Sequence, residues 1–533
     1  MASNPELPRS GSEWSGLCRV ADPAWLRLGP RGSLAFMLAG CLLLVGWQMQ
    51  VPDDPAQLDR TYERSVGFGL YRYRIQKFFY FFYYTGKFPI STKMDVGHLR
   101  WNEKDAWRAL GDDAGVVSRL DQKWKTPKLI MEDRGFLRTG DLGKIFLLYP
   151  HAWVNGTPKR ATLRAFNRGL GIASLLALFV SFALLNHRLL GTTLVLVLGS
   201  HPFQMVELYA KNNIFGHPIA IASLMLALHA PLILTSRPRG RWVYLLPIVS
   251  GVFLASFRET RLEPALVILS VAGCYLFVAG GWRRRTLLVG MLAVTAMVTS
   301  TLWTRYWDAK FEDAYAIVER QGGVTFDGDW NTHHAFWHSL WWGLGDFASD
   351  KGYWPDDRAA HAYGIPRVNQ RFGTKYRTNP YSRSLRDYYT AERKHRVKPE
   401  TLPEYGLVLK EKVLGDIRAD PLWYAGIIVK RLDRLFSLAT PIRLGIGARY
   451  VDVPFSAWLF LPAILWLAYL RRWDQLKLLA FYLPASLSTV AVFSGKSMPY
   501  NSAFHLVLFA VVVCWAAQAL SAARTLRVRR SIR

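Results

Sequence analysis

The sequence predicts an all-α polytopic membrane protein with about ten transmembrane helices and two large extracytoplasmic loop domains. Of the 533 residues, 51% are hydrophobic and 14% aromatic, and 21 are Trp. A soluble fold rarely carries that much apolar mass. Apolar runs near the length of a bilayer span recur along the chain, and arginines gather in every second connection between these runs.

The apolar runs lie at about 33–50, 166–186, 189–206, 213–235, 242–257, 262–281, 286–304, 454–470, 477–494 and 501–522. Several are short, so the number of spans is open by one or two. The chain divides into a cytoplasmic segment 1–32, a first span 33–50, a first loop domain 51–165, spans in 166–304, a second loop domain 305–453, spans in 454–522 and a basic tail 523–533. The first run follows a polar segment, so it predicts a signal anchor.

The arginine-rich connections fix the predicted orientation. They hold Arg19, Arg27 and Arg31; Arg188; Arg237, Arg239 and Arg241; Arg283, Arg284 and Arg285; Arg471 and Arg472; and Arg524, Arg527, Arg529, Arg530 and Arg533. By the positive-inside rule, both termini lie in the cytoplasm and both loop domains lie outside the cell membrane, with a bacterial inner membrane favoured.

The net charge of +28 does not predict a nucleic-acid partner. The basic residues form no single patch, and the sequence contains no zinc finger, helix-turn-helix or RNA-binding signature. Many of them lie in short connections, where they meet anionic headgroups. The lipid bilayer is the partner that the charge pattern predicts.

Two segments of the loop domains have the pattern of surface helices. Seven consecutive aromatic residues follow Lys77 and extend to Tyr84, which favours a helix in the headgroup layer over a buried strand. The segment 421–436 carries apolar positions at helical spacing with basic residues between them, which predicts a second amphipathic helix.

Polar groups collect in short connections on the predicted external side. Ionisable residues at span ends are often anchors, but polar groups that converge from separate helices normally line a cavity. We therefore expect a polar cavity on this face, formed by Asp53, Asp54, Glu207, Lys211, His217, Arg258, Arg261, Glu263, Lys496 and His505.

The chain resembles the GT-C superfamily of polyprenyl-phosphate-sugar-dependent glycosyltransferases. The resemblance rests on the many spans, a long external loop after the first span that begins Val51-Pro-Asp-Asp-Pro55, and a late external domain. It implies an inverting transfer from a polyprenyl-phosphate-linked sugar donor to a glycan or lipid acceptor. In that family a carboxylate of the first external loop is the base, which carries over to Asp53 and Asp54, with Asp95 as a further candidate.

The chemistry explains these residue types. A carboxylate takes the proton from an acceptor hydroxyl as it attacks the anomeric carbon. Cationic groups stabilise the departing lipid phosphate, and the candidates for that role are Arg258, Arg261, Lys211, Lys496 and His505. A divalent metal, Mg²⁺ or Mn²⁺, stays open as a cofactor. The alternative for Asp53 and Asp54 is a turn or helix cap, because Asp beside Pro is common there.

The stretch Trp330–Gly345 is the densest polar and aromatic part of the second loop domain. Trp rings stack on sugar rings while His and Asp bond hydroxyls, so substrate-binding candidates are His333, His334, His338, Trp337, Asp346 and, from the external connections, Glu207. The alternative is an aromatic core of the loop domain. His334 and His338 are four residues apart and on a helix would share one face, as metal ligands do, but no zincin motif surrounds them and no metal site is assigned.

Other functions compete with this interpretation. An O-antigen polymerase or ligase would use Arg258, Arg261, His333 and His338 rather than a carboxylate. A transporter or flippase would draw on Glu207, Glu263 and His229 for a proton or substrate path. A structural or assembly role in the membrane is a further alternative.

Overall fold

The computed structural model describes residues 28–51, 79, 82–84, 86–87, 142–154, 163–200, 208–209, 216–234, 240–260, 263–278, 280–320, 325–327, 336–378, 388–389, 395–397, 399, 402–437, 442–446, 449–453 and 457–487. Helices dominate these residues, and four of them are long and apolar enough to cross a membrane: Pro30–Met49, Leu163–Leu184, His217–Leu234 and Trp282–Ala314. The membrane character expected from the sequence is therefore confirmed, whereas ten spans remain a prediction.

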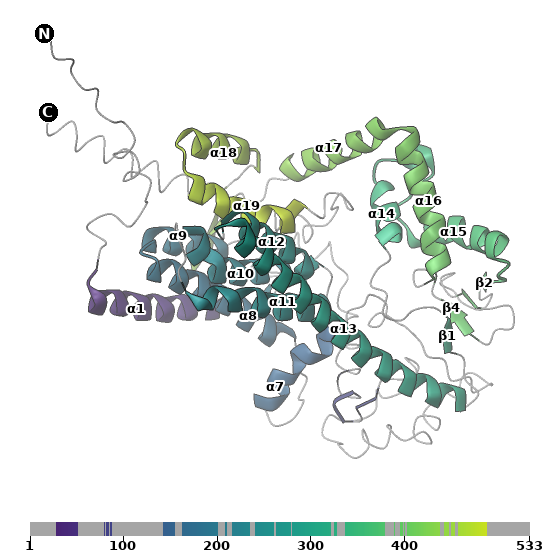
Figure 1. Ribbon diagram of the computed structural model, residues 1–533, viewed down its shortest axis with the longest axis horizontal. Helices are drawn as coiled ribbons and strands as arrows, with labels where there is room; N and C mark the ends of the chain where they lie inside the picture. The colour runs from purple at the N-terminus through teal and green to yellow at the C-terminus, as the bar shows by residue number, and fades with distance from the viewer. Residues whose placement is uncertain are drawn as a thin grey trace, which may run out of the picture.

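A bundle of apolar helices forms the larger part of the structure (Figure 1). Its members are α1 (Pro30–Met49), α8 (Leu163–Leu184), α9 (Arg188–Ser200), α10 (His217–Leu234), α11 (Leu245–Arg258), α12 (Val267–Val278) and α13 (Trp282–Arg320). The short helices η5 (Arg241–Tyr244) and η6 (Glu263–Leu266) lead into α11 and α12. Later in the chain, η9 (Ala457–Leu459), α18 (Phe460–Tyr469) and α19 (Trp473–Leu487) follow, and α19 packs on α10 and α12.

Successive helices of the bundle alternate in direction. Gln48 at the end of α1 bonds the backbone of Gly199 at the end of α9, whereas Arg188 at the start of α9 bonds Ser33 at the start of α1. His217 and Asn167 join the starts of α10 and α8 in the same way. This alternation agrees with the up-and-down order that the arginine pattern predicts.

The bundle core is close-packed and almost entirely apolar. Gly40 lets α1 approach α8, since an added Cβ would lie 2.2 Å from the Phe179 ring. Such small residues allow close helix contact in membranes. A buried polar pair crosses the core, where the His229 imidazole lies 2.8 Å from the Tyr275 hydroxyl and bonds the Met225 carbonyl through its other nitrogen. Both ring nitrogens of His229 are thus engaged within the packed core.

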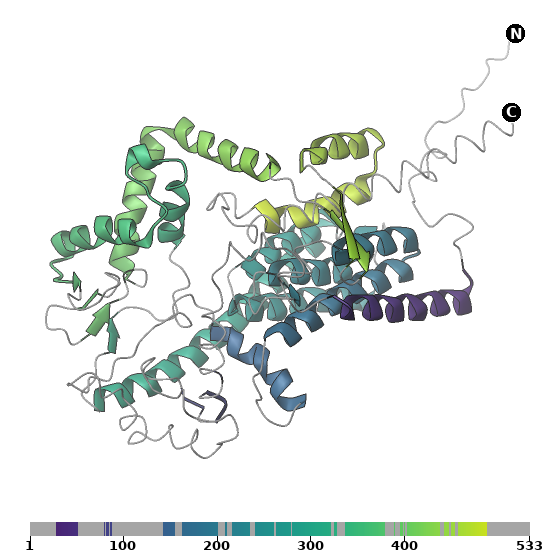
Figure 2. The ribbon, with the colours of Figure 1, turned by 180° about the vertical axis from the view of Figure 1, so that it is seen from behind.

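Helix α13 is longer than a membrane span. Its 39 residues correspond to about 58 Å, whereas the hydrocarbon core is about 30 Å thick. The seventh span expected from the sequence ends at residue 304, but the helix continues to Arg320 without a break. The second half of α13 therefore projects past the other helices of the bundle, as Figures 1 and 2 show.

A second group of helices lies to one side of the bundle (Figure 2), and Ile428 and Leu432 of its last helix pack against the bundle core. It contains α14 (Phe336–Leu344), η7 (Ser349–Lys351), α15 (Asp357–Phe372), α16 (Pro403–Ala419) and α17 (Pro421–Ser437), with its own core around Trp341, Tyr353 and Tyr405. Helix α17 confirms the helix expected at 421–436. We call this group the loop helices.

Short strands also occur among the described residues, which the all-α expectation did not include. Strands β1 (Thr325–Asp327), β2 (Arg377–Thr378), β3 (Tyr388–Tyr389) and β4 (His395–Val397) form a sheet of order β1-β4-β3-β2. Strands β5 (Ile442–Ile446) and β6 (Arg449–Val453) form an antiparallel pair. Strands β1 to β4 are only two or three residues long, too short for the alternation that identifies a strand in a sequence.

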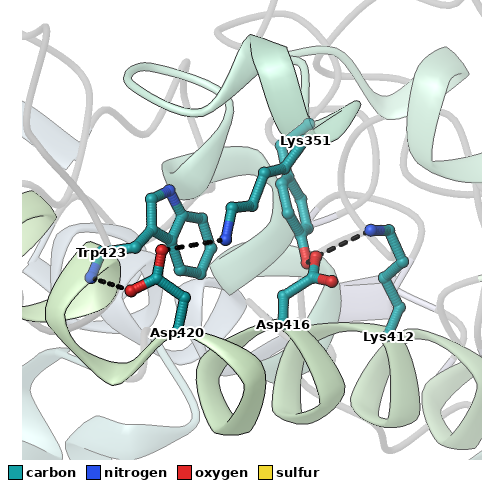
Figure 3. A network of polar contacts seen from close by, with 6 residues as sticks. Lys351, Lys412, Asp416, Asp420 and Trp423 are labelled. Atoms are coloured by element: carbon teal, nitrogen blue, oxygen red, sulfur yellow. Dashed lines mark hydrogen bonds and ion pairs between the residues drawn. The ribbon is translucent and has the colours of Figure 1, made fainter.

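A charged network fixes the corner between α16 and α17 (Figure 3). The Lys351 ammonium lies 4.2 Å from the centre of the Trp423 ring and 3.6 Å from the Asp420 carboxylate. Asp420 also accepts a 2.9 Å bond from the Trp423 backbone, which caps α17. On α16, Asp416 accepts bonds of 2.7 Å from both Lys412 and Tyr353. The corner is therefore held by side chains of η7, α16 and α17 together.

Candidate functional site at the polar end of the bundle

Polar side chains gather at one end of the bundle, where α1 and α11 end and α8 and α10 begin. We call this group the polar end; its described members are Gln48, Asn167, Arg168, Tyr209, His217 and Glu259. All lie on the side that the arginine pattern places outside the cell. Val51, Tyr209 and Phe257 share one apolar cluster beneath them, which connects the end of α1 to the end of α11.

Arg168 holds the chain where it leaves the first helix. Its guanidinium donates bonds of 2.8 Å to the Val51 carbonyl and 3.3 Å to the Met49 carbonyl, and it lies 5.4 Å from the centre of the Tyr209 ring. Tyr209 in turn donates a 2.7 Å bond to Gln48. The last carbonyls of α1 lack helical partners, so Arg168 satisfies groups that the helix itself cannot.

A buried histidine joins the starts of α8 and α10. The His217 Nε2 lies 2.6 Å from the Asn167 side-chain oxygen, and both residues are fully buried. Its ring contacts Phe166 and Phe257 at centroid distances of 5.8 and 6.0 Å. Phe257 lies two residues before Glu259. The His217–Asn167 pair therefore fixes the two helix starts next to the end of α11.

Glu259 is the buried carboxylate of the polar end. Only 6% of the residue is exposed, and its Oε2 accepts a 2.8 Å bond from the Trp307 indole on α13. Burial raises the pKa of Glu259, while the Trp307 bond and the Arg258 charge oppose that shift. Buried carboxyl groups with a raised pKa are common at functional sites.

The Glu259 backbone also receives part of the first loop domain. The Gly143 amide donates a 2.9 Å bond to the Glu259 carbonyl. An added Cβ at Gly143 would lie 2.8 Å from the Glu259 carbonyl carbon, so only glycine permits this approach. Gly143 begins a segment formed by η3 (Leu142–Leu148) and α7 (Tyr149–Val154), which therefore docks on the end of α11.

Aromatic rings cover the outer side of Glu259. Phe146 contacts Trp303 and Trp307 of α13 at 5.2 and 5.6 Å, and the two indoles stack at 5.7 Å. Tyr149 joins this group, and burial, with smaller effects from neighbouring tyrosines, raises its pKa to about 12. Tyr149 thus remains a neutral phenol at physiological pH.

The aromatic run of the first loop also packs on protein. The described residues of this run, Phe79 and 82–84, are helical, as expected. Phe79 and Phe82 are buried, however, and Phe79 contacts Tyr149 at 5.2 Å. Lys310 of α13 donates a 2.9 Å bond to the Gly86 carbonyl. These rings therefore contribute to the junction between the first loop and α13.

Most residues named from the sequence lie outside the described part of the chain. These are Asp53, Asp54, Asp95, Glu207, Lys211, Arg261, His333, His334, Lys496 and His505. Arg258 is described: it is half-buried at the end of α11 and adjoins Glu259. The polar cavity expected on this face therefore remains a prediction, as do the roles of these ten residues.

The loop-helix candidates lie apart from the polar end. His338 lies 2.9 Å from the Tyr405 hydroxyl and 3.3 Å from the Asp357 carboxylate, and its ring stacks on His361 at 5.5 Å. Asp346 pairs with Arg434 at 3.7 Å. Within the described residues no three His, Cys, Asp or Glu side chains form a group that could hold a metal ion.

The described aromatic residues and histidine of the stretch Trp330–Gly345 differ in how far they are buried. Trp341 and His338 are 1% and 4% exposed, as the core alternative expects. Trp337 is half-buried, lies 5.0 Å from the Phe336 ring and receives the Lys410 ammonium at 6.0 Å. Trp337 is thus the described member of the set that a sugar ring could still reach.

Glu259 and Trp307 were not among the functional residues predicted from the sequence. Glu259 belongs to the Arg258–Arg261 segment, in which only the two arginines were predicted to bind the lipid phosphate. Trp303 and Trp307 are four residues apart, so they share one face of α13. The predicted span ended at residue 304, however, and therefore did not include Trp307. If the helix had been predicted to continue past residue 304, both indoles would have been expected on the same side of the membrane as the Arg258–Arg261 segment.

No protein-family model matches this chain, and no curated protein or solved structure matches it significantly.

Proposed function

We propose that this protein is an integral membrane glycosyltransferase. It transfers a sugar from a polyprenyl-phosphate donor to a glycan or lipid acceptor on the extracytoplasmic face, with inversion and with a carboxylate as base. The observation that supports this function best is the convergence of Arg168, Arg258 and the buried Glu259 at one end of the bundle. Polar groups at membrane depth are costly to bury and typically mark substrate paths.

The position of the Arg168 contact supports a base in the first loop. Arg168 bonds the carbonyl of Val51, and Asp53 and Asp54 come two and three residues later in the sequence. A carboxylate that accepts a proton from a hydroxyl must be held in place relative to the donor. A guanidinium that anchors the preceding backbone provides such an attachment.

Glu259 is a second candidate for the base. Burial raises its pKa, as is common for carboxyl groups that transfer protons, and the Trp307 bond fixes its carboxylate. Arg258 beside it carries the charge expected of a group that stabilises a lipid phosphate leaving group. The half-buried rings of Phe146 and Trp303 offer faces on which a sugar or isoprenoid chain would pack.

The decisive experiment measures transfer of radiolabel from a panel of polyprenyl-phosphate sugars to endogenous acceptors in membranes. Wild type is compared at matched expression with Asp53→Asn/Asp54→Asn, with Glu259→Gln and with Glu411→Gln. Glu411 is an exposed loop-helix carboxylate paired with Arg371, so its variant controls for loss of a negative charge.

We expect labelled product with wild type and Glu411→Gln, and its loss in the Asp53→Asn/Asp54→Asn variant. Loss only in Glu259→Gln would assign the base to the end of α11 instead. If wild-type membranes form no product from any donor in the panel, the glycosyltransferase proposal fails.

A further inference from the structure

We infer that the bundle binds an anionic phospholipid in a groove between α11 and α13, at the end opposite to the polar end. The groove has a volume of about 600 Å³. Ile248 of α11 lines one side, and Trp282, Arg283, Leu287, Gly290 and Val294 of α13 line the other. This site is independent of the proposed sugar transfer, which belongs to the other end of the bundle.

The dimensions of the groove fit one acyl chain. From Arg283 to Val294 the helix rises about 16 Å, which is close to the thickness of one leaflet, roughly half of the 30 Å hydrocarbon core. Gly290 keeps the middle of the groove open, because an added Cβ would meet no atom within 4 Å. Leu287 and Val294 are exposed among the described residues, so their apolar surface faces the chain of a lipid.

The mouth of the groove carries the groups that recognise a phosphate headgroup. Arg283 is exposed, and its guanidinium lies 5.7 Å from the centre of the Trp282 ring. Arg284 lies at the same distance from Tyr244, at the start of α11. Trp282 is 72% exposed, as is typical of a tryptophan at the membrane interface.

Charge complementarity selects the class of lipid. Three consecutive arginines at residues 283–285 begin α13 directly above an apolar groove, and basic residues near the membrane surface favour anionic lipids by about 1 kcal/mol each. A phosphatidylglycerol-type headgroup matches this site, with one acyl chain along Gly290. By the arginine pattern this lipid belongs to the cytoplasmic leaflet.

The test is native mass spectrometry of the full chain in detergent, titrated with palmitoyl-oleoyl phosphatidylglycerol or with the phosphatidylcholine of the same chains. Arg283→Gln removes the headgroup charge, and Gly290→Leu fills the groove. Arg305→Gln and Gly273→Leu are the matched controls. Arg305 is exposed further along α13, and Gly273 on α12 also has open space around its added Cβ.

We expect the first bound phosphatidylglycerol to be retained about fivefold less by Arg283→Gln, the loss that one basic residue near the surface predicts. Gly290→Leu should weaken both lipids, and both controls should bind as wild type does. Equal retention of the two lipids by wild type would overturn the inference, and so would phosphatidylglycerol binding that none of the variants changes.

Discussion

The Nε1 of Trp307 lies 2.8 Å from Oε2 of Glu259, and this bond joins the middle of α13 to the end of α11. Two groups act on this buried carboxylate, namely the Trp307 indole that donates to it and the positive charge of the adjoining Arg258. Because a hydrogen bond to a carboxylate favours its charged form, Trp307 moderates the pKa that burial raises. Proton affinity at the polar end therefore depends on a residue of a different helix.

Replacing Trp307 by Phe should destabilise the protein more at pH 8 than at pH 5. Burial holds the folded pKa of Glu259 above its unfolded value, and loss of the indole donor raises it further. Stability from such a group is present below the unfolded pKa and lost as the pH rises through the folded pKa. Thermal unfolding of the detergent-solubilised protein, measured across this pH range, gives the readout.

The matched control for that variant is Trp303→Phe. Trp303 donates a 3.1 Å bond to the uncharged Ser256 hydroxyl and stacks on Trp307 one helical turn away. Its loss should cost a similar amount, about 1–2 kcal/mol, at every pH tested. If the two variants showed the same pH dependence, Glu259 would not be the titrating group.

Gly143→Ala should detach the segment 142–154 from the bundle. The added Cβ would lie 2.8 Å from the Glu259 carbonyl carbon, and relief of that overlap breaks the Gly143–Glu259 bond, at about 1–3 kcal/mol. Limited proteolysis followed by mass spectrometry should show faster cleavage within 142–154. Gly169→Ala on α8 is the control, since its Cβ would meet no atom within 4 Å. Equal cleavage of the two variants would contradict the tight contact.

The helices of the bundle could be predicted from the sequence because burial in lipid imposes long apolar runs and arginines that alternate between connections. The polar end could be predicted only in outline. Arg258 was identified as an ionisable residue at a span end, a pattern that local sequence displays. The Trp307–Glu259 bond joins residues 48 positions apart, and only the packing of α11 on α13 creates it.

The loop helices, too, could be predicted from the sequence only in part. Helix α17 was predicted because its apolar and basic positions repeat at helical spacing. The buried position of His338 was not predicted, because whether a histidine lines a surface or a core depends on what packs over it. Tyr405, 67 residues away, covers one ring nitrogen of His338, and Asp357 lies at the other.

Gly364→Ala should loosen the contact between α15 and α16. The added Cβ would lie 2.4 Å from the Tyr405 ring, so the ring must move and its bond to His338 is strained or lost. Hydrogen exchange of α14 amides should speed up as a result. Gly406→Ala adds the same methyl group next to Tyr405 in the sequence but into open space, and should leave that exchange unchanged. Unaltered exchange in Gly364→Ala would show that the ring is not held against α15.

Asp416→Asn should remove an acid-sensitive contribution to the stability of the loop helices. Burial alone would raise the pKa of Asp416, but the hydrogen bonds from Lys412 and Tyr353 lower it overall. A lowered folded pKa gives stability that is present above the ordinary Asp value of about 3.9 and is lost as the pH falls through the folded pKa. The difference in unfolding temperature between wild type and Asp416→Asn should therefore be largest near pH 7 and shrink towards pH 3.

The control for Asp416 is Glu411→Gln on the same helix. The Arg371–Glu411 pair has a 2.6 Å contact, but both side chains are exposed, and exposed ion pairs contribute little to stability. Asp416 differs because its side chain is only 25% exposed and contacts Tyr353, which is itself fully buried. A pH profile for Glu411→Gln that matched the Asp416→Asn profile would mean that net charge, rather than the network of Figure 3, sets the acid sensitivity of these helices.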